Sequence, residues 1–227
     1  MSSTEETYLQ ELINDFPCKT KVTAEKAIIM LQKRYKLLEP DFTSDVVNIL
    51  RNREDLCNII LYEVSKIIHK HLFRNILSNA GEFRKSTDPG NGFIGFGGVS
   101  KRIAGNLEFH GIAPNEIAAE LSGAFSYLNG KTEDPVRNGV LFYRRYVRIH
   151  PYYDGNGRIG RLILIIYLRM FNFQINMERI PKDKLLKKIN NCHKRESKPD
   201  EFERYLNFLL ELMREAISRI EEDAVDN

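Results

Sequence analysis

Residues His150 to Arg161 read His-Pro-Tyr-Tyr-Asp-Gly-Asn-Gly-Arg-Ile-Gly-Arg, and this stretch decides how the whole chain is interpreted. It joins the predicted end of one helix to the predicted start of the next through a tight Asp-Gly-Asn-Gly turn. Glycine and asparagine tolerate positive φ angles, so successive backbone N–H groups in this turn can point inward and bind an anion. The helix that begins there adds the positive end of its dipole at the same place. The turn therefore predicts a binding site for phosphate groups.

The side chains around the turn add chemistry to this anion site. Arg158 and Arg161 are three residues apart, so they share one helix face and can both bind phosphate oxygens. Asp154 would repel those phosphates unless a cation lies between them, and a bridging Mg²⁺ ion removes the conflict. His150 titrates near neutral pH and can take a proton from a hydroxyl. Together these residues predict a site for the transfer of a nucleotide phosphate group.

The alternative to a phosphate site is a purely structural turn between two helices, with Arg158 and Arg161 exposed to solvent. For the Asp-Gly-Asn-Gly turn alone, that alternative is the better one. Chance agreement at eight specified positions, however, is on the order of one in ten billion per site, given ordinary residue usage. We therefore favour the functional interpretation.

Most of the remaining chain is predicted to be helical. Apolar spacing and helix-start signals predict helices over residues 22–38, 55–77, 114–128, 135–149, after 157, and over 200–222. Asp134 is expected to cap the helix that begins at Pro135. Residues 81–111 are the exception, because they hold eight glycines and few helical signals. Phe93, Ile94 and Phe96 lie between glycines there, which predicts a short β-hairpin or an extended flap.

Three weaker patterns favour plain structural interpretations. Residues 90–95 match the dinucleotide fingerprint letter by letter, but they lack a preceding strand and a following helix, so we interpret them as a turn. His69 and His71 are two apart on a helix and face different directions, which is poor geometry for a shared metal; we expect one in the core and one on the surface. Residues 182–198 carry a net charge of +5, which favours a solvated helix face over a phosphate contact.

Composition narrows the class of protein. The chain has 227 residues, a net charge of +3 and 42% hydrophobic residues, which excludes disorder and indicates against a dedicated nucleic-acid binder. Its three cysteines, Cys18, Cys57 and Cys192, form no disulfide framework or metal knuckle, so a reducing compartment fits best. The longest apolar run, residues 162–168, is far too short to span a membrane, and the polar N-terminus has no apolar signal region. We expect a cytoplasmic protein without a membrane partner.

At residues 150–161 the sequence resembles the signature of the Fic (filamentation induced by cAMP) family, H-P-F-x-[DE]-G-N-G-R-x-x-R, with Tyr152 in place of the phenylalanine. Residues 68–73, followed by Ala-Gly-Glu-Phe-Arg at 80–84, resemble the lead-in helix and the AGxxR element of that family. The resemblance covers roughly residues 60–215. It implies a mainly α fold, a Fic-type helical bundle with a small β-hairpin flap. The implied domains are an N-terminal helical extension (1–59), a Fic core (60–198), and a closing helix with an acidic tail (199–227).

The resemblance also implies an activity, namely the transfer of AMP from ATP to a Tyr, Ser or Thr hydroxyl of a target protein, with Mg²⁺ as cofactor. Carried over by position, His150 is the catalytic base and Asp154 holds the Mg²⁺ ion. The implied nucleotide-binding residues are Gly155, Asn156, Gly157, Arg158 and Arg161. The implied residues of the flap that positions the target are Phe93, Ile94, Gly95 and Phe96.

Other functions remain open at the same site. They are de-AMPylation, transfer of another nucleoside monophosphate, or a non-enzymatic role as a nucleotide-binding regulator. The complete Gly-Asn-Gly-Arg at 155–158 argues against the family's kinase branch, which resembles x-N-K-R there. It also argues against the phosphocholine-transferring branch, which has Ala before the Asn.

The resemblance also bears on regulation. Many relatives are inhibited by a helix that carries [ST]-x-x-x-E-[GN], and the nearest match here is residues 218–223, with Asp at the last position. Glu222 would then pair with Arg161. Residues 137–169 carry a net charge of +6 and residues 200–227 one of −6, so an acidic tail could lie against the phosphate site. The simpler interpretation is an exposed acidic helix end, with inhibition by a separate antitoxin-like protein or none.

Overall fold

The two helices that are joined by the His150–Arg161 stretch form the centre of the molecule. The structure is a computed structural model that describes residues 3–38, 41–94 and 111–220. Helix α6 (Pro135–Ile149) starts where the sequence predicts, because Asp134 accepts a hydrogen bond from the backbone N–H of Arg137 at 2.8 Å. Helix α7 (Asn156–Met170) follows and packs directly against α6. The two helices thus place the phosphate-binding turn at their junction.

Close packing between α6 and α7 depends on small residues. Gly139 faces Leu164, and a Cβ atom added at Gly139 would lie 2.6 Å from Leu164 Cδ1. Leu164 and its neighbours on α7 are buried, and α7 also packs against α3 and α4. Helix α7 is therefore a central helix whose position is fixed from several sides.

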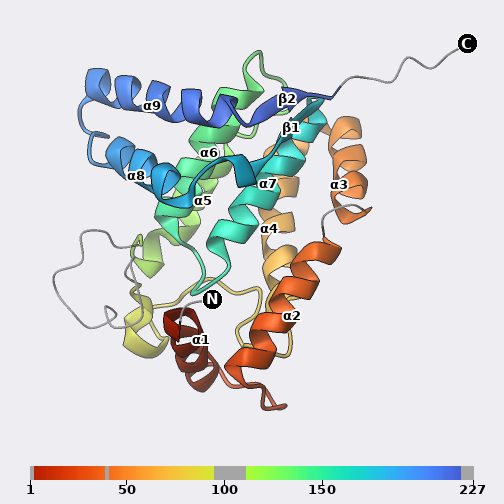
Figure 1. Ribbon diagram of the computed structural model, residues 1–227, viewed down its shortest axis with the longest axis vertical. Coiled ribbons are helices and arrows are strands. Elements are labelled where there is room, and N and C mark those ends of the chain that lie inside the picture. The colour runs from red at the N-terminus through yellow and green to blue at the C-terminus, as the bar shows by residue number, and fades with distance from the viewer. Residues whose placement is uncertain (1–2, 39–40, 95–110, 221–227) are drawn as a thin grey trace, which may run out of the picture.

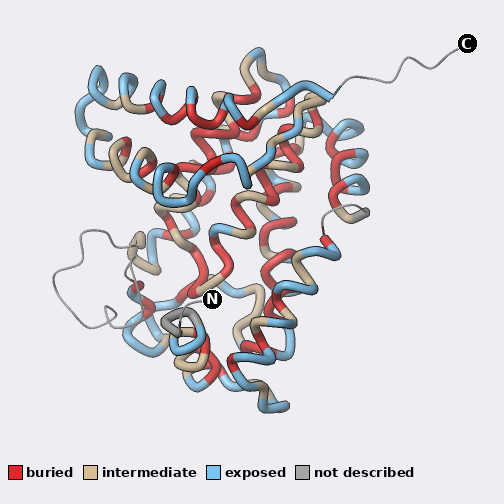
Figure 2. Tube along the Cα trace, viewed as in Figure 1, coloured by how far each residue is buried: buried red, intermediate tan, exposed pale blue. Residues whose placement is uncertain are grey.

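The other helices surround this pair (Figure 1). They are α1 (Ser3–Asp15), α2 (Ala24–Leu37), α3 (Asp41–Asn52), α4 (Cys57–Phe73), α5 (Ile117–Phe125), α8 (Lys182–His193) and α9 (Pro199–Arg214). Short 3₁₀ turns lie at Glu54–Leu56, Pro89–Gly92, Pro114–Glu116 and Met177–Arg179. Helices α1 to α3 share one hydrophobic core with the rest, and Figure 2 shows the buried stretches running along the inward faces of the helices.

The mainly helical prediction is confirmed, and most helices lie where they were expected. The helix predicted over 55–77 ends at Phe73, and a positive φ of 62° at Asn75 marks the chain turning away. The helix predicted over 114–128 is α5 with the preceding 3₁₀ turn, and it ends at Phe125. No helix in the described part of the chain is both long and apolar enough to cross a membrane.

The helix predicted over 200–222 is confirmed up to Arg214 and is wrong for the described residues beyond it. Helix α9 ends at Arg214, and the chain then enters strand β2 (Ile217–Arg219). Strand β2 pairs antiparallel with β1 (Phe173–Ile175), with Gln174 opposite Ser218. Local sequence could not show this pairing because both strands have three residues and lie far apart along the chain. The segment around Ser218 is therefore not part of an inhibitory helix, and Glu222 lies outside the described residues.

The glycine-rich segment is described only at its two ends. Residues 89–92 form a 3₁₀ turn with positive φ at Gly90 and Asn91, which confirms a turn and excludes the dinucleotide fingerprint. The backbone N–H of Gly111 donates to the carbonyl of Ile94 at 3.1 Å, so the two ends are bonded to each other. The predicted hairpin between them, including Gly95 and Phe96, lies outside the described residues.

Candidate active site

His150 sits at the end of α6 in an unusual backbone conformation. Its φ of 53° lies in the left-handed region, and its backbone N–H closes the helix by donating to the Tyr146 carbonyl at 3.1 Å. Burial lowers the pKa of His150 to about 4, and the positive charge of Arg84 acts in the same direction. A hydrogen bond with the backbone of Val147 and the charge of Asp154 oppose this shift. The imidazole is therefore neutral at pH 7 and able to accept a proton.

Arg84 holds the backbone around His150 in place. Its buried guanidinium donates to the carbonyls of His150 (2.8 Å), Ile149 (3.3 Å), Ile112 (2.9 Å) and Gly92. Gly92 and Ile112 lie on either side of the glycine-rich segment, so a single side chain joins both ends of that segment to the end of α6. The resemblance pointed to Arg84 only as part of a sequence element and gave no role for it.

Tyr153 connects the turn to the N-terminal helix. The hydroxyl of Tyr8 on α1 donates to the Tyr153 carbonyl at 2.5 Å, and the rings of Phe16 and Tyr153 lie 4.8 Å apart. The Tyr153 hydroxyl donates in turn to Asp88 at 3.0 Å, just before the glycine-rich segment. Residues 1–59 carried no signal for such a role, because Tyr8 and Tyr153 are 145 positions apart.

The ring of His69 packs against the ring of Tyr152 in the motif. The rings of His69 and Tyr152 are stacked with centroids 3.8 Å apart, and Nδ1 of His69 accepts a hydrogen bond from the backbone N–H of Gly81 at 2.7 Å. Burial lowers the pKa of His69 to about 3, so the ring is neutral. His69 is thus the core histidine of the pair predicted from the sequence.

The Asn156 side chain closes the turn. Its Oδ1 accepts from the backbone N–H of Tyr152 at 3.0 Å, and its Nδ2 donates to the Tyr152 carbonyl at 2.7 Å. The amide is buried, so only the backbone N–H of Asn156 remains for a ligand. Sequence spacing alone could not show that the side chain of Asn156 closes the turn while its backbone N–H remains for a ligand.

The start of α7 has free hydrogen-bond donors. The first backbone N–H groups of a helix, here those of Asn156, Gly157 and Arg158, have no carbonyl one turn earlier to bind. Gly155 occupies the N-cap with a φ of 82° and has no side chain to accept from them. A Cβ added at Gly157 would meet nothing within 4 Å, so the space beside this turn is open. These features are those of an anion site.

The two arginines of the motif differ in their contacts. Arg158 forms an ion pair with Asp154, with both carboxylate oxygens 3.1 Å from Nη2. The Asp154 carboxylate also accepts from the backbone N–H of Gly155 at 2.5 Å. Arg161 donates to the Gly157 carbonyl at 3.1 Å and has no acidic partner in the part of the chain that the structure describes. Its charge is therefore available to a ligand.

The structure thus brings the predicted residues at positions 150, 154–158 and 161 together at the junction of α6 and α7. Of the predicted flap residues, Phe93 is 55% exposed, whereas Ile94 is 5% exposed. Ile94 therefore anchors the base of the segment with its side chain. Gly95, Phe96 and Glu222 lie outside the described residues.

The helix start without a side-chain cap, flanked by two arginines and next to a neutral histidine, has the features of an anion-binding site. The model of the Fic/DOC family matches residues 60–168, so this part of the chain belongs to the Fic/DOC family. The BepC protein of Bartonella tribocorum, a VirB-translocated effector solved with bound AMPPNP, has the same fold. It matches with a TM-score of 0.54 and 15% identity over 92% of this chain and 98% of that chain.

Two curated relatives match shorter stretches. Protein adenylyltransferase fic-1 of Caenorhabditis briggsae is 29% identical over 69 residues, which is 29% of this chain and 14% of the relative. A protein of Aquifex aeolicus named Probable protein adenylyltransferase is 47% identical over 36 residues, which is 16% of this chain and 11% of the relative. The chain thus matches a small part of each relative.

We predict that Gly155→Ala destabilises the protein, whereas Gly157→Ala does not. Alanine at 155 must adopt a φ of 82°, and its Cβ would lie 2.7 Å from Cε2 of Phe73. These two effects together cost about 2–4 kcal/mol of unfolding free energy. Alanine at 157 meets no atom and suits a helix. Urea unfolding of both variants measures the difference, and equal unfolding free energies would contradict the geometry of the turn.

We also predict that His150 titrates far below an ordinary histidine. With a folded pKa of about 4, against about 6.5 in the unfolded chain, the unfolded state binds more protons between these values. The contribution of His150 to stability is therefore complete above pH 6.5 and is lost as the pH falls towards 4. NMR titration of the His150 imidazole, assigned with His150→Gln, measures the midpoint. A midpoint near 6.5 contradicts the prediction.

Proposed function

We propose that this chain is a protein adenylyltransferase, which transfers AMP from ATP to a tyrosine, serine or threonine hydroxyl of a target protein. The observation that carries the proposal is the neutral His150 beside the uncapped start of α7. Further support comes from the Fic/DOC match, from the two relatives with adenylyltransferase names, and from BepC with its bound AMPPNP.

In this proposal His150 accepts the proton of the target hydroxyl. The hydroxyl oxygen attacks the α-phosphorus of ATP and forms the new P–O bond. The bond from the α-phosphorus to the bridging oxygen breaks, and its electron pair leaves with pyrophosphate. Only a neutral imidazole can act as this base, and the low pKa of His150 keeps it neutral at physiological pH.

The start of α7 holds the phosphates. The backbone N–H groups of residues 156–158 bind phosphate oxygens, and the helix dipole favours their negative charge. Arg161 adds its guanidinium without losing an acidic partner among the described residues. Arg158 contributes after it exchanges Asp154 for phosphate, because the two side chains form an ion pair in the structure.

Asp154 fits the role of a Mg²⁺ ligand. It is a partly exposed carboxylate next to the proposed phosphate site, and its oxygens are already held by Arg158 and Gly155. The described residues contain no group of three or more His, Cys, Asp or Glu that could hold a metal. An ion here would therefore depend on Asp154 together with substrate phosphates, which is a common mode for Mg²⁺. When bound, Mg²⁺ neutralises phosphate charge during the transfer.

The target protein approaches from the side of the glycine-rich segment. Phe93 exposes an apolar ring there, and Ile94 and Gly111 fix the base of the segment. A cavity of about 460 Å³ lies next to Ile112 and Ile149 on this side. Both glutamates that line it are paired, Glu196 with Arg144 and Glu120 with Arg145.

The proposal is tested by incubating the full chain with Mg²⁺, α-labelled ATP and a cell lysate. We expect labelled protein with α-labelled ATP and none with γ-labelled ATP. The variant His150→Gln should lose labelling by about 100-fold or more, because it lacks the general base. The variant His71→Gln, changed at a histidine outside the site, is the matched control and should keep full activity.

The same assay separates the alternatives. Stronger labelling with α-labelled UTP or GTP than with ATP indicates transfer of another nucleoside monophosphate. Removal of label from a premodified protein, without any transfer from ATP, indicates de-AMPylation. Saturable ATP binding without turnover in every lysate tested contradicts the proposal and favours a nucleotide-binding regulator.

A further inference from the structure

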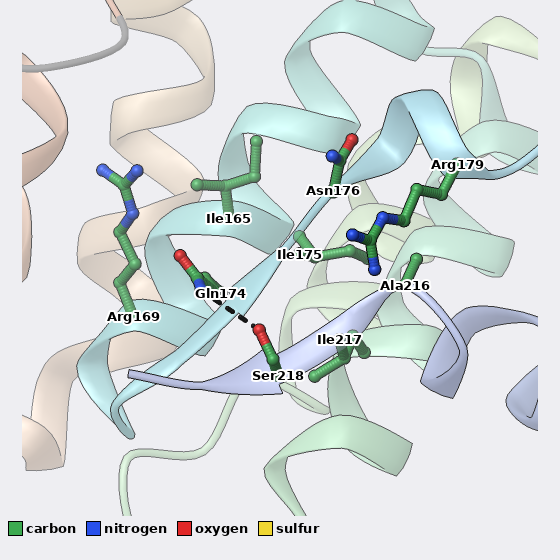
Figure 3. A pocket seen from close by; sticks show the side chains of 9 residues that line it. All are labelled: Ile165, Arg169, Gln174, Ile175, Asn176, Arg179, Ala216, Ile217 and Ser218. Atoms are coloured by element: carbon green, nitrogen blue, oxygen red, sulfur yellow. Dashed lines mark hydrogen bonds between the residues drawn. The ribbon is translucent and has the colours of Figure 1, made fainter. Parts of the chain in front are cut away.

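A second pocket lies at the far end of α7 from the candidate active site. It has a volume of about 350 Å³ and lies between the last turns of α7, strands β1 and β2, and the turn at Met177–Arg179 (Figure 3). Along α7, the first residue that lines the pocket is Ile165, which lies about 14 Å of helix rise beyond Asn156. The polar residues that line it are Arg169, Gln174, Asn176, Arg179 and Ser218.

Two arginines of this pocket have no acidic partner among the residues that the structure describes. Figure 3 shows Arg169 and Arg179 on opposite sides of the pocket, with Ile175 between them. Neither side chain makes a hydrogen bond or ion pair within the described ranges 3–38, 41–94 and 111–220. None of the described residues that line the pocket is acidic. Among the described residues, the pocket thus carries two positive charges that no side chain neutralises.

The partial negative charge at the C-terminal end of α7 does not cancel the positive charge of Arg169 and Arg179. Carbonyls at the C-terminal end of a helix normally repel an anion. Here the side chain of Arg51 donates to the carbonyl of Arg169 at 3.1 Å and to Oδ1 of Asn172 at 2.5 Å, and it also approaches the Met170 carbonyl. The guanidinium of Arg51 therefore binds the carbonyl groups at the end of α7 that would otherwise repel an anionic ligand.

The polar neighbours leave hydrogen-bond donors towards the pocket. Nε2 of Gln174 donates to Oγ of Ser218 at 3.1 Å, which leaves the hydroxyl hydrogen of Ser218 to donate elsewhere. Oδ1 of Asn176 accepts from the backbone N–H of Glu178 at 3.0 Å, so the amide nitrogen of Asn176 remains a donor. Donors and cations in one pocket match the oxygens of an anion.

We propose that this pocket binds a small organic anion with two phosphate or carboxylate groups, one for each arginine. Guanidinium groups bind both kinds of oxygen pair in a forked geometry. The volume lies at the lower end of the range for small-molecule pockets. Ile165, Ile175 and Ile217 line the pocket and contact the apolar body of the ligand. This site is separate from the proposed adenylyltransferase activity and does not depend on it.

The test is an NMR titration of the full ¹⁵N-labelled chain at about 0.15 M salt. The probes are 3-phosphoglycerate, which carries one phosphate and one carboxylate, and citrate, which carries carboxylates alone. We expect saturable shifts of the Gln174, Asn176 and Ser218 amides with at least one probe, at a Kd of about 1 mM or tighter. The probe that binds more tightly identifies the preferred anionic group.

Variants separate a built site from general charge attraction. The double variant Arg169→Gln/Arg179→Gln should weaken binding at least tenfold. The matched control Arg204→Gln/Arg214→Gln removes the same charge from exposed positions on α9 and should bind as the unmodified chain does. Shifts that do not saturate with either probe, or that weaken equally in both double variants, overturn the proposal.

A single variant keeps the test decisive if the double variant does not fold. Arg179 is exposed, so Arg179→Lys removes the forked geometry while it keeps the charge. We expect binding about threefold weaker or worse in Arg179→Lys. Unchanged binding in this variant overturns the proposal.

Discussion

The guanidinium of Arg84 is the group on which the candidate active site depends. It binds four backbone carbonyls from three segments: residue 92 before the glycine-rich stretch, residue 112 after it, and residues 149–150 at the end of α6. Burial lowers the pKa of Arg84 to about 10, so it remains a cation at neutral pH. A buried carbonyl left without a donor costs about 1–3 kcal/mol. One cation therefore fixes both the backbone of His150 and the base of the proposed flap.

Sequence reasoning succeeded where local chemistry decides the structure. The start of α6 follows from an aspartate followed by proline, and the left-handed backbone at Gly155 follows from the glycines of the turn. It failed where contacts are far apart in sequence: the bond from Tyr8 to Tyr153, and the pairing of β1 with β2. A three-residue strand has no periodicity to detect, and an apolar pattern that continues past Arg214 looks like more helix.

In the structure, the arginines of residues 137–169 do not all contribute to one phosphate site, as their clustering in the sequence had suggested. The arginine-rich segment 137–169 suggested one phosphate site opposed by an acidic C-terminal segment. In the structure Arg137 pairs with Glu203 on α9, and Arg145 pairs with Glu120 on α5. Only the arginines of the motif reach the phosphate-binding turn, and Arg169 lines the pocket at the other end of α7. Glu203 on α9 thus pairs with the first turn of α6 and not with an arginine of the motif.

The guanidinium of Arg84 uses its donors on backbone carbonyls, so we expect it to position His150 and the flap base and not to bind nucleotide. The most direct measurement is the rate of the proposed AMP transfer by Arg84→Lys, together with the affinity of this variant for ATP. Lysine keeps the charge, but one ammonium group cannot bind four carbonyls in this geometry. The account predicts a rate lower by about 100-fold, as expected for a misplaced base, with nearly unchanged ATP affinity in the folded variant. An unchanged rate, or a loss of ATP affinity that accounts for the whole loss of rate, would contradict it.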